Sequence, residues 1–343
     1  MEKFTDFIPQ NVATVGAKNI GVFDTNGVKM CQIELGSLAL PSNKGNKLYS
    51  FGALSDIHVS QDTAEADFRR ALTYFQDTED VAFVCVAGDL GQHDGGQSTA
   101  EWMLYSQCVA EESENTPVYP IGGNHDANGI TLDDVFEEYT GYKTFYTFTQ
   151  GNDVFLMLSS SAYPSQSKAQ PFATENLQKL QQALETNRNK RCFVFQHYFP
   201  WGKSGDPLEC YGSNDAFWGT QGQFIYSLMA HYKNALWFHG HSHQMFEAQA
   251  LHDQATYDTD FGCHNIHIPS CALPVKVTAS GSRIPLAEGS QGYVVDVYGN
   301  GIHLRGRDFM KDAFLPIASY WLDTTLQTVE AGTYTDSTGT VCE

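Results

Sequence analysis

The chain has 343 residues, and its 20 basic and 40 acidic residues give a formal net charge of -20. This acidity excludes duplex nucleic acid and anionic membranes as main partners, because both bind through a basic surface. The length and the apolar share of 42% fit a large folded domain with an ample core.

The cysteines and the N-terminus bear on the cellular compartment. Eight cysteines are scattered along the chain without a C-x-x-C pair, so we expect free, buried thiols in a reducing compartment. The expectation is weakest at Cys210, Cys263 and Cys271, which lie in loop-like segments. No apolar run is long enough to cross a bilayer, and residues 1–6 lack the pattern of a secretory signal. We therefore expect a cytoplasmic protein.

Residues 1–47 are predicted to form an appendage with a β-hairpin. The apolar segments 20–23 and 28–33 flank Asp24-Thr25-Asn26-Gly27, and Asn-Gly between such segments is a strong hairpin signal. The core domain is expected at 48–310. A C-terminal extension is expected at 311–343, with an added strand at Ile317–Leu322.

From Leu48 onward, strand patterns alternate with helix patterns, which predicts an α/β fold with a largely parallel first sheet. Apolar residues at helical spacing predict helices at 62–78, 98–112, 131–139, 175–186 and 221–232, the first with Asp62 as its N-cap. Further strands are expected at 144–149 and 154–159, which form a hairpin, and at 244–251, 265–269, 292–298 and 301–309. The long aromatic and glycine-rich segment 198–219 is expected to be a functional loop.

Five apolar segments end in residues that bind metals or transfer protons. The central one, Val118–Ile121, leads into Gly122-Gly123-Asn124-His125-Asp126. The other segments, 48–54, 81–87, 191–196 and 235–238, lead into Asp56-Ile57-His58, Gly88-Asp89, His197 and Gly240-His241-Ser242-His243. Ligands of open α/β sheets bind at the carboxyl ends of the strands. We therefore expect these side chains to converge.

Seven of these residues are candidate metal ligands: Asp56, His58, Asp89, Asn124, His197, His241 and His243. Oxygen ligands supply charge and imidazoles supply geometry for metals that cleave phosphate esters. Seven donors are too many for one ion with an open position, and they suit two ions that share a carboxylate. Such a pair, roughly 3.5–4 Å apart, holds a bridging hydroxide that can attack phosphorus.

In order and spacing, the five segments resemble the motifs of the calcineurin-like metallophosphoesterases. The resemblance implies a four-layer αββα sandwich of two mixed β-sheets flanked by helices. It implies that Asp56, His58 and His243 hold one metal ion, that Asn124, His197 and His241 hold the other, and that Asp89 bridges them. It also implies that His125 is catalytic and stabilises or protonates the leaving group, oriented by Asp126.

Departures from related branches narrow the expected activity. Purple acid phosphatases have glycine in place of His58, and a tyrosine where this chain has Gln92. Serine/threonine protein phosphatases have Gly-Asp-x-Val-Asp-Arg-Gly where this chain has Gly88 to Asp94. The pattern looks more like the bacterial branch that includes cyclic-nucleotide and other small phosphodiesterases. We expect hydrolysis of a small phosphodiester or phosphomonoester with manganese, iron or zinc, between which these ligands do not choose.

Simpler interpretations and a second function stand beside this one. Taken singly, a strand-end histidine is more often structural, and Asp89 or Asn124 fits a turn. The alternative function is a catalytically weak or inactive binding or assembly module on the same fold, with self-association or docking into a larger assembly through the two terminal extensions. His93 and Asp94 are candidates for contact with the site or the substrate, and Arg283 for a phosphate clamp, but each is more simply a solvated surface residue. A group of aromatic residues either lines the substrate cleft or forms a small core under the loop: Tyr198, Phe199, Trp201, Phe217 and Trp218.

Overall fold

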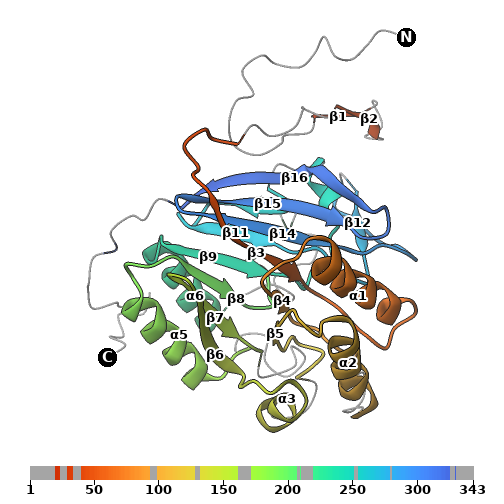
Figure 1. The fold of residues 1–343 in the computed structure, drawn as a ribbon. Coiled ribbons are helices and arrows are strands. Elements are labelled where there is room, and N and C mark those ends of the chain that lie inside the picture. Colours follow the sequence, from red (N-terminus) through yellow and green to blue (C-terminus); the bar gives the residue numbers. More distant parts are fainter. Residues whose placement is uncertain are drawn as a thin grey trace.

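The computed structural model describes residues 20–23, 29–33, 40–92, 99–127, 132–160, 171–206, 209, 219–250, 254–278, 280–324 and 329. Two six-stranded sheets stack face to face, and helices cover the outer face of each sheet (Figure 1). This arrangement is the expected four-layer αββα sandwich.

The first sheet has the strand order β16-β15-β14-β3-β4-β5. Its strands are β3 (Lys47–Leu54), β4 (Val84–Ala87), β5 (Val118–Ile121), β14 (Gln291–Tyr298), β15 (Gly301–Asp308) and β16 (Ala313–Asp323). β3, β4 and β5 are parallel, whereas β14, β15 and β16 add antiparallel neighbours. Because β16 forms an edge of this sheet, the core sheet continues past the expected boundary at residue 310.

The second sheet has the order β10-β11-β9-β8-β7-β6. Its strands are β6 (Phe145–Gln150), β7 (Asp153–Leu158), β8 (Cys192–Phe195), β9 (Ala235–His239), β10 (Tyr257–Asp258) and β11 (His264–His267). β7, β8, β9 and β11 are parallel, and β6 and β10 are antiparallel to their neighbours. Two small antiparallel pairs stand apart: β1 (Ile20–Phe23) with β2 (Lys29–Ile33), and β12 (Val275–Val277) with β13 (Arg283–Pro285). The first pair supplies the strands of the expected N-terminal hairpin, whose turn at 24–28 lies outside the described residues.

The helices divide between the two outer faces (Figure 1). α1 (Ala64–Thr73), α2 (Thr99–Glu112) and α3 (Leu132–Thr140) cover the first sheet, and α5 (Thr174–Thr186) and α6 (Gly219–His231) cover the second. None of the helices in the described segments is long and apolar enough to cross a membrane. The five cysteines whose side chains are described are free and buried, as expected: Cys85, Cys108, Cys192, Cys263 and Cys271.

Two local predictions are wrong. Thr63 occupies the N-cap position of α1 in place of Asp62, and its hydroxyl bonds the Asp67 carboxylate at 2.8 Å instead of capping the main chain. The strand expected at 244–251 is a short 3₁₀ helix at Phe246–Ala250. There the Phe246 ring enters the core between the sheets, and its main-chain N–H donates to the side chain of Gln291 at 2.9 Å. Tertiary packing therefore overrides the strand pattern of this segment.

The core between the sheets is largely aromatic. Phe51 of β3 meets Phe155 of β7 and Phe193 of β8 edge-on, with ring centroids 5.3 and 5.4 Å apart. Phe155 and Phe193 stack on each other at 4.6 Å. Edge-to-face and offset-stacked pairs add about 0.5–1.5 kcal/mol each beyond the area they bury. This packing aligns the two sheets, so that the loops after β3, β4, β5, β8 and β9 come together.

Candidate metal centre

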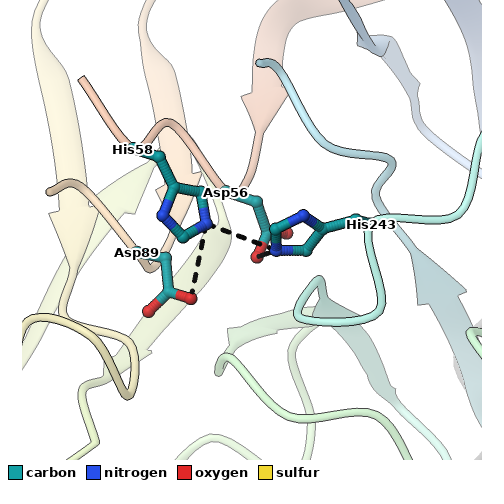
Figure 2. A group of neighbouring side chains, drawn as sticks. All are labelled: Asp56, His58, Asp89 and His243. Carbon is teal, nitrogen blue, oxygen red and sulfur yellow. Dashed lines mark hydrogen bonds and ion pairs between the residues drawn. The ribbon is translucent and has the colours of Figure 1, made fainter. Parts of the chain in front are cut away.

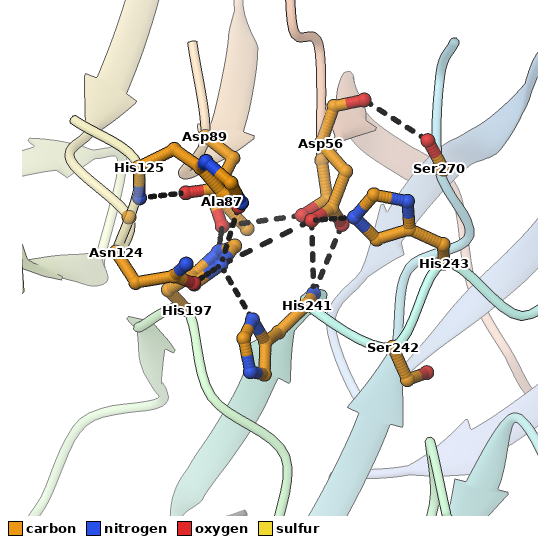
Figure 3. A network of polar contacts seen from close by, with 12 residues as sticks. Asp56, Ala87, Asp89, Asn124, His125, His197, His241, Ser242, His243 and Ser270 are labelled. Atoms are coloured by element: carbon orange, nitrogen blue, oxygen red, sulfur yellow. Dashed lines mark hydrogen bonds and ion pairs between the residues drawn. The ribbon is translucent and has the colours of Figure 1, made fainter. Parts of the chain in front are cut away.

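Hydrogen bonds between main-chain groups hold the strand-end loops against one another. The N–H of Asp56 donates to Gly88 O at 3.0 Å, and the N–H of Gly240 donates to His197 O at 3.0 Å. All seven expected ligands are brought together by these loops. Figure 2 shows four of them, Asp56, His58, Asp89 and His243, and Figure 3 shows all of them except His58.

The first group consists of Asp56, His58, Asp89 and His243, and it places one donor atom of each residue within 4.8 Å of all the others (Figure 2). His243 Nε2 lies 3.1 Å from Asp56 Oδ1 and 3.3 Å from His58 Nε2. His58 Nε2 lies 3.7 Å from Asp89 Oδ2. His243, with 16% of its side chain exposed, opens this group to solvent on one side.

The second group consists of Asp89, His197 and His241. His197 Nε2 lies 3.2 Å from Asp89 Oδ2 and 3.1 Å from His241 Nδ1. The side-chain oxygen of Asn124 joins them at 3.0 Å from His197 Nε2 (Figure 3). Asp89 thus belongs to both groups, at the position expected for a bridging ligand.

Carbonyl groups of the main chain set the tautomers of two histidines. His197 Nδ1–H donates to Ala87 O, and His243 Nδ1–H donates to Leu273 O, both at 2.8 Å. In the neutral imidazoles the lone pair of Nε2 then faces the cluster, as in histidines that bind metals. His197 Nε2 faces Asn124 Oδ1 at 3.0 Å and Asp89 Oδ2 at 3.2 Å, and the latter is a buried oxygen with no well-aligned hydrogen-bond partner among the described residues. This donor set fits a transition-metal cation in each group.

Burial and the attraction between opposite charges have opposing effects on the pKa values of the cluster. Burial alone would lower the pKa of His197, but the Asp89 carboxylate, with Asp56, raises it to about 9. Burial lowers the pKa of His58 to about 3, against the attraction of Asp89. Burial disfavours the ionised carboxyls, yet His243 beside Asp56 and His197 beside Asp89 hold the pKa of both below their usual range. In the metal-free protein, a proton on His197 therefore stands in for a cation.

Five of the seven candidate ligands have a left-handed backbone. Their φ angles are 54° at Asp56, 47° at His58, 52° at Asp89, 71° at His241 and 59° at His243. This conformation costs a residue with a Cβ atom roughly 1–2 kcal/mol, and it persists only where the surrounding structure enforces it. Such a concentration of strain in one cluster is typical of a functional site.

Glycines next to the ligands allow the loops to approach closely. A Cβ atom on Gly123 would collide with the main chain and carboxylate of Asp89, and one on Gly240 would collide with the carboxylate of Asp56. These glycines therefore determine where the two carboxylates lie.

Asp126 binds main-chain N–H groups of two strand-end loops. Its buried carboxylate accepts the N–H groups of Leu90 and Gly91 at 3.0–3.1 Å and that of Gly123 at 2.8 Å. His125 Nδ1 lies 2.9 Å from the main-chain carbonyl of Gln92. Asp126 thus holds the loop that carries this carbonyl, and through this loop it can help to orient His125. A main-chain acceptor has no signature in the sequence, so the contribution of Gln92 could not be predicted.

The aromatic residues that follow His197 pack against the candidate ligand His241. Tyr198 and Phe199 are buried, and their ring centroids lie 4.8 and 5.6 Å from that of His241. They form a small core behind the imidazole, whereas Trp201 is 45% exposed. Arg283 lies in the exposed strand β13. The remaining candidates, His93, Asp94, Phe217 and Trp218, lie outside the described residues.

Stacked mixed sheets with carboxylate and imidazole donors gathered at the strand ends are the arrangement that the metallophosphoesterase resemblance implies. The chain belongs to the calcineurin-like phosphoesterase family, whose sequence model matches residues 49–245. No curated protein sequence matches the chain.

Two solved structures share the fold. Purple acid phosphatase PPD1 from yellow lupin (Lupinus luteus) seeds is 13% identical with a TM-score of 0.55, and the match covers 82% of this chain and 55% of that one. The chain thus spans about half the length of that phosphatase. GAP50, the anchor in the inner membrane complex of Plasmodium, is 16% identical with a TM-score of 0.51, and the match covers 83% of this chain and 91% of that one.

The left-handed backbone at His58 leads to a prediction about stability. At an ordinary position in a helix or strand, a protein with glycine is less stable than the same protein with alanine by roughly 0.5–1 kcal/mol. At a φ of 47° we expect the reverse, with His58→Gly more stable than His58→Ala by about 1 kcal/mol. Urea unfolding of the metal-free variants measures the difference. The same pair of substitutions at His303 in β15 is the control, where alanine should be more stable. A His58→Ala variant at least as stable as His58→Gly would contradict the strain.

The raised pKa of His197 leads to a prediction about metal binding. Its proton stabilises the metal-free protein fully below the ordinary pKa of 6.5, and this stabilisation is lost as the pH rises through about 9. A cation must displace that proton, so apparent affinity should fall as the pH falls below about 9. Calorimetric titration with manganese at pH 7.5, in buffers of different ionisation enthalpy, should show release of at least one proton per chain. Binding without proton release would show that His197 is neutral in the metal-free protein.

Proposed function

We propose that the chain is a dinuclear metal-dependent phosphoesterase that hydrolyses a small phosphodiester or phosphomonoester. The observation that carries the proposal is the sharing of Asp89 by two groups of largely buried donors. Asp56, His58 and His243 would hold one ion, and Asn124, His197 and His241 would hold the other. Manganese, iron and zinc all suit these ligands.

Two bound cations would activate water and neutralise charge on the phosphoryl group. The protein supplies the geometry of the site. Asp89 keeps the two groups adjacent, and the carbonyls of Ala87 and Leu273 keep the imidazoles of His197 and His243 turned toward the site.

His125 is suited to assist the leaving group. It is only partly buried, and its ring centroid lies 5.1 Å from that of His58, at the border of the first group. With Nδ1–H donated to Gln92 O, Nε2 is the atom that exchanges a proton with substrate. In the imidazolium form, Nε2–H can protonate the leaving-group oxygen, a contribution typically worth about 10²–10⁴-fold in rate. A purely binding module would gain nothing from such a histidine, which supports hydrolysis over the assembly alternative.

Replacement of His125 by alanine tests this role. Alkyl phosphate esters need a proton on the leaving oxygen, so we expect kcat for them to fall about 100-fold or more. The fall should be much smaller for a p-nitrophenyl ester, whose leaving group departs as a stable anion. Metal content, measured by mass spectrometry, should be unchanged.

Three outcomes would speak against the proposal. Equal losses for the two ester classes would remove His125 from proton transfer. Binding of metal by the wild-type protein without turnover of any small ester would favour the binding module. Failure of the wild-type protein to bind two ions would contradict the dinuclear site itself.

A further inference from the structure

A second buried polar cluster lies behind the metal centre, at the carboxyl ends of β9 and β11. His239 ends β9 and His267 ends β11, and the two residues are direct neighbours in the parallel pair. Both are fully buried, with ring centroids 5.6 Å apart. Neither belongs to the groups of candidate ligands. Their contacts with the neighbouring loops indicate what these two histidines do there.

The first contact of this cluster is with the loop after β9, which carries two candidate ligands. His267 Nε2 lies 2.8 Å from Ser242 Oγ, and Ser242 is the residue between His241 and His243. The serine is fully buried, and its side chain points away from the ligand side chains (Figure 3). The hydrogen bond therefore holds the loop from behind while its two imidazoles face the site.

The second contact is with the loop that follows His197. His239 Nε2 lies 3.2 Å from Ser204 Oγ. That serine is held in turn, because its main-chain N–H donates to Asp258 Oδ2 and its hydroxyl accepts from Asn265 Nδ2, both at 2.6 Å.

The loop also packs directly on the histidine pair. Gly205 adopts a φ of 90°, and a Cβ atom there would lie 3.0 Å from the ring of His267 and 3.2 Å from that of His239. Its carbonyl accepts from Gln244 Nε2 at 2.6 Å. The loops after β8 and β9 are therefore joined through the pair.

The ligand loop needs such support, because φ is 71° at His241 and 59° at His243. Two successive candidate ligands with a left-handed backbone relax unless neighbouring groups hold the peptides in place. We propose that His267, through Ser242, and His239, through Ser204, are positioning residues that keep His241, His243 and His197 in the geometry that binds metal. The inference rests on the proposed metal site, and neither histidine is a ligand or touches substrate in it.

The experiment compares metal binding by variants that keep the shape of the buried site. His267→Phe and Ser242→Ala each remove the hydrogen bond, and His267→Gln keeps a polar group near Nε2. A matched control exists in β15, where His303 Nε2 lies 2.9 Å from Ser319 Oγ, and His303→Phe breaks that bond. Manganese affinity is measured by calorimetry. The absorption spectrum of the cobalt-loaded protein reports ligand geometry, and thermal unfolding without metal reports stability.

We expect His267→Phe and Ser242→Ala each to weaken manganese binding by about 10-fold or more, as is typical when a group that orients a metal ligand is lost. The cobalt spectrum should change, and His267→Gln should recover most of the affinity. The double variant should lose little more than either single variant, because both remove one interaction. Ser204→Ala should weaken binding in the same direction through the second contact. His303→Phe should leave affinity and spectrum unchanged.

Two results would overturn the inference. One is wild-type affinity and an unaltered cobalt spectrum in folded His267→Phe. The other is that His267→Phe and His303→Phe lose manganese affinity to the same extent, each in proportion to its fall in unfolding temperature. His239 and His267 would then be an ordinary part of the core. Failure of the wild-type protein to bind manganese or cobalt would instead contradict the proposed function, so the two failures are distinguishable.

Discussion

Two carboxylates buried in one cluster need nearby positive charge, and this electrostatic constraint shapes the rest of the site. Asp56 and Asp89 are both fully buried. The transfer of an ion from water to a protein interior costs several kcal/mol unless a partner compensates. Imidazoles compensate in the metal-free protein, where His197 has a pKa raised to about 9. Metal cations would compensate better, since each brings more charge among the carboxylate oxygens and imidazole nitrogens.

The fold serves this constraint at several levels. An aromatic core aligns two sheets, so that five strand ends meet. Glycines 123 and 240 permit the carboxylates to come close, and the left-handed residues turn the loops after β3, β4 and β9 within one or two positions. The strain that results is the reason for the further supports: the Gln92 carbonyl for His125, the Asp126 carboxylate for the β4 loop, and the buried His239 and His267 behind the β9 loop.

The convergence of the candidate ligands could be predicted from the sequence because each follows an apolar strand, and because neither core packing nor turn formation accounts for the ordered set. The layers followed from the alternation of strands and helices and from the family resemblance. Features that depend on tertiary contacts could not be predicted. Ser242 and His267 are 25 positions apart, and nothing local marks them as partners. Phe246 leaves a strand pattern because its ring fills the core, and β16 extends the core beyond residue 310 because β15 offers it an edge.

The shared role of Asp89 is tested most directly by anomalous diffraction from crystals soaked in manganese. We expect two anomalous peaks roughly 3.5–4 Å apart, with the Asp89 carboxylate between them, Asp56, His58 and His243 around one, and Asn124, His197 and His241 around the other. A single peak, or two peaks that do not share Asp89, would contradict the dinuclear site.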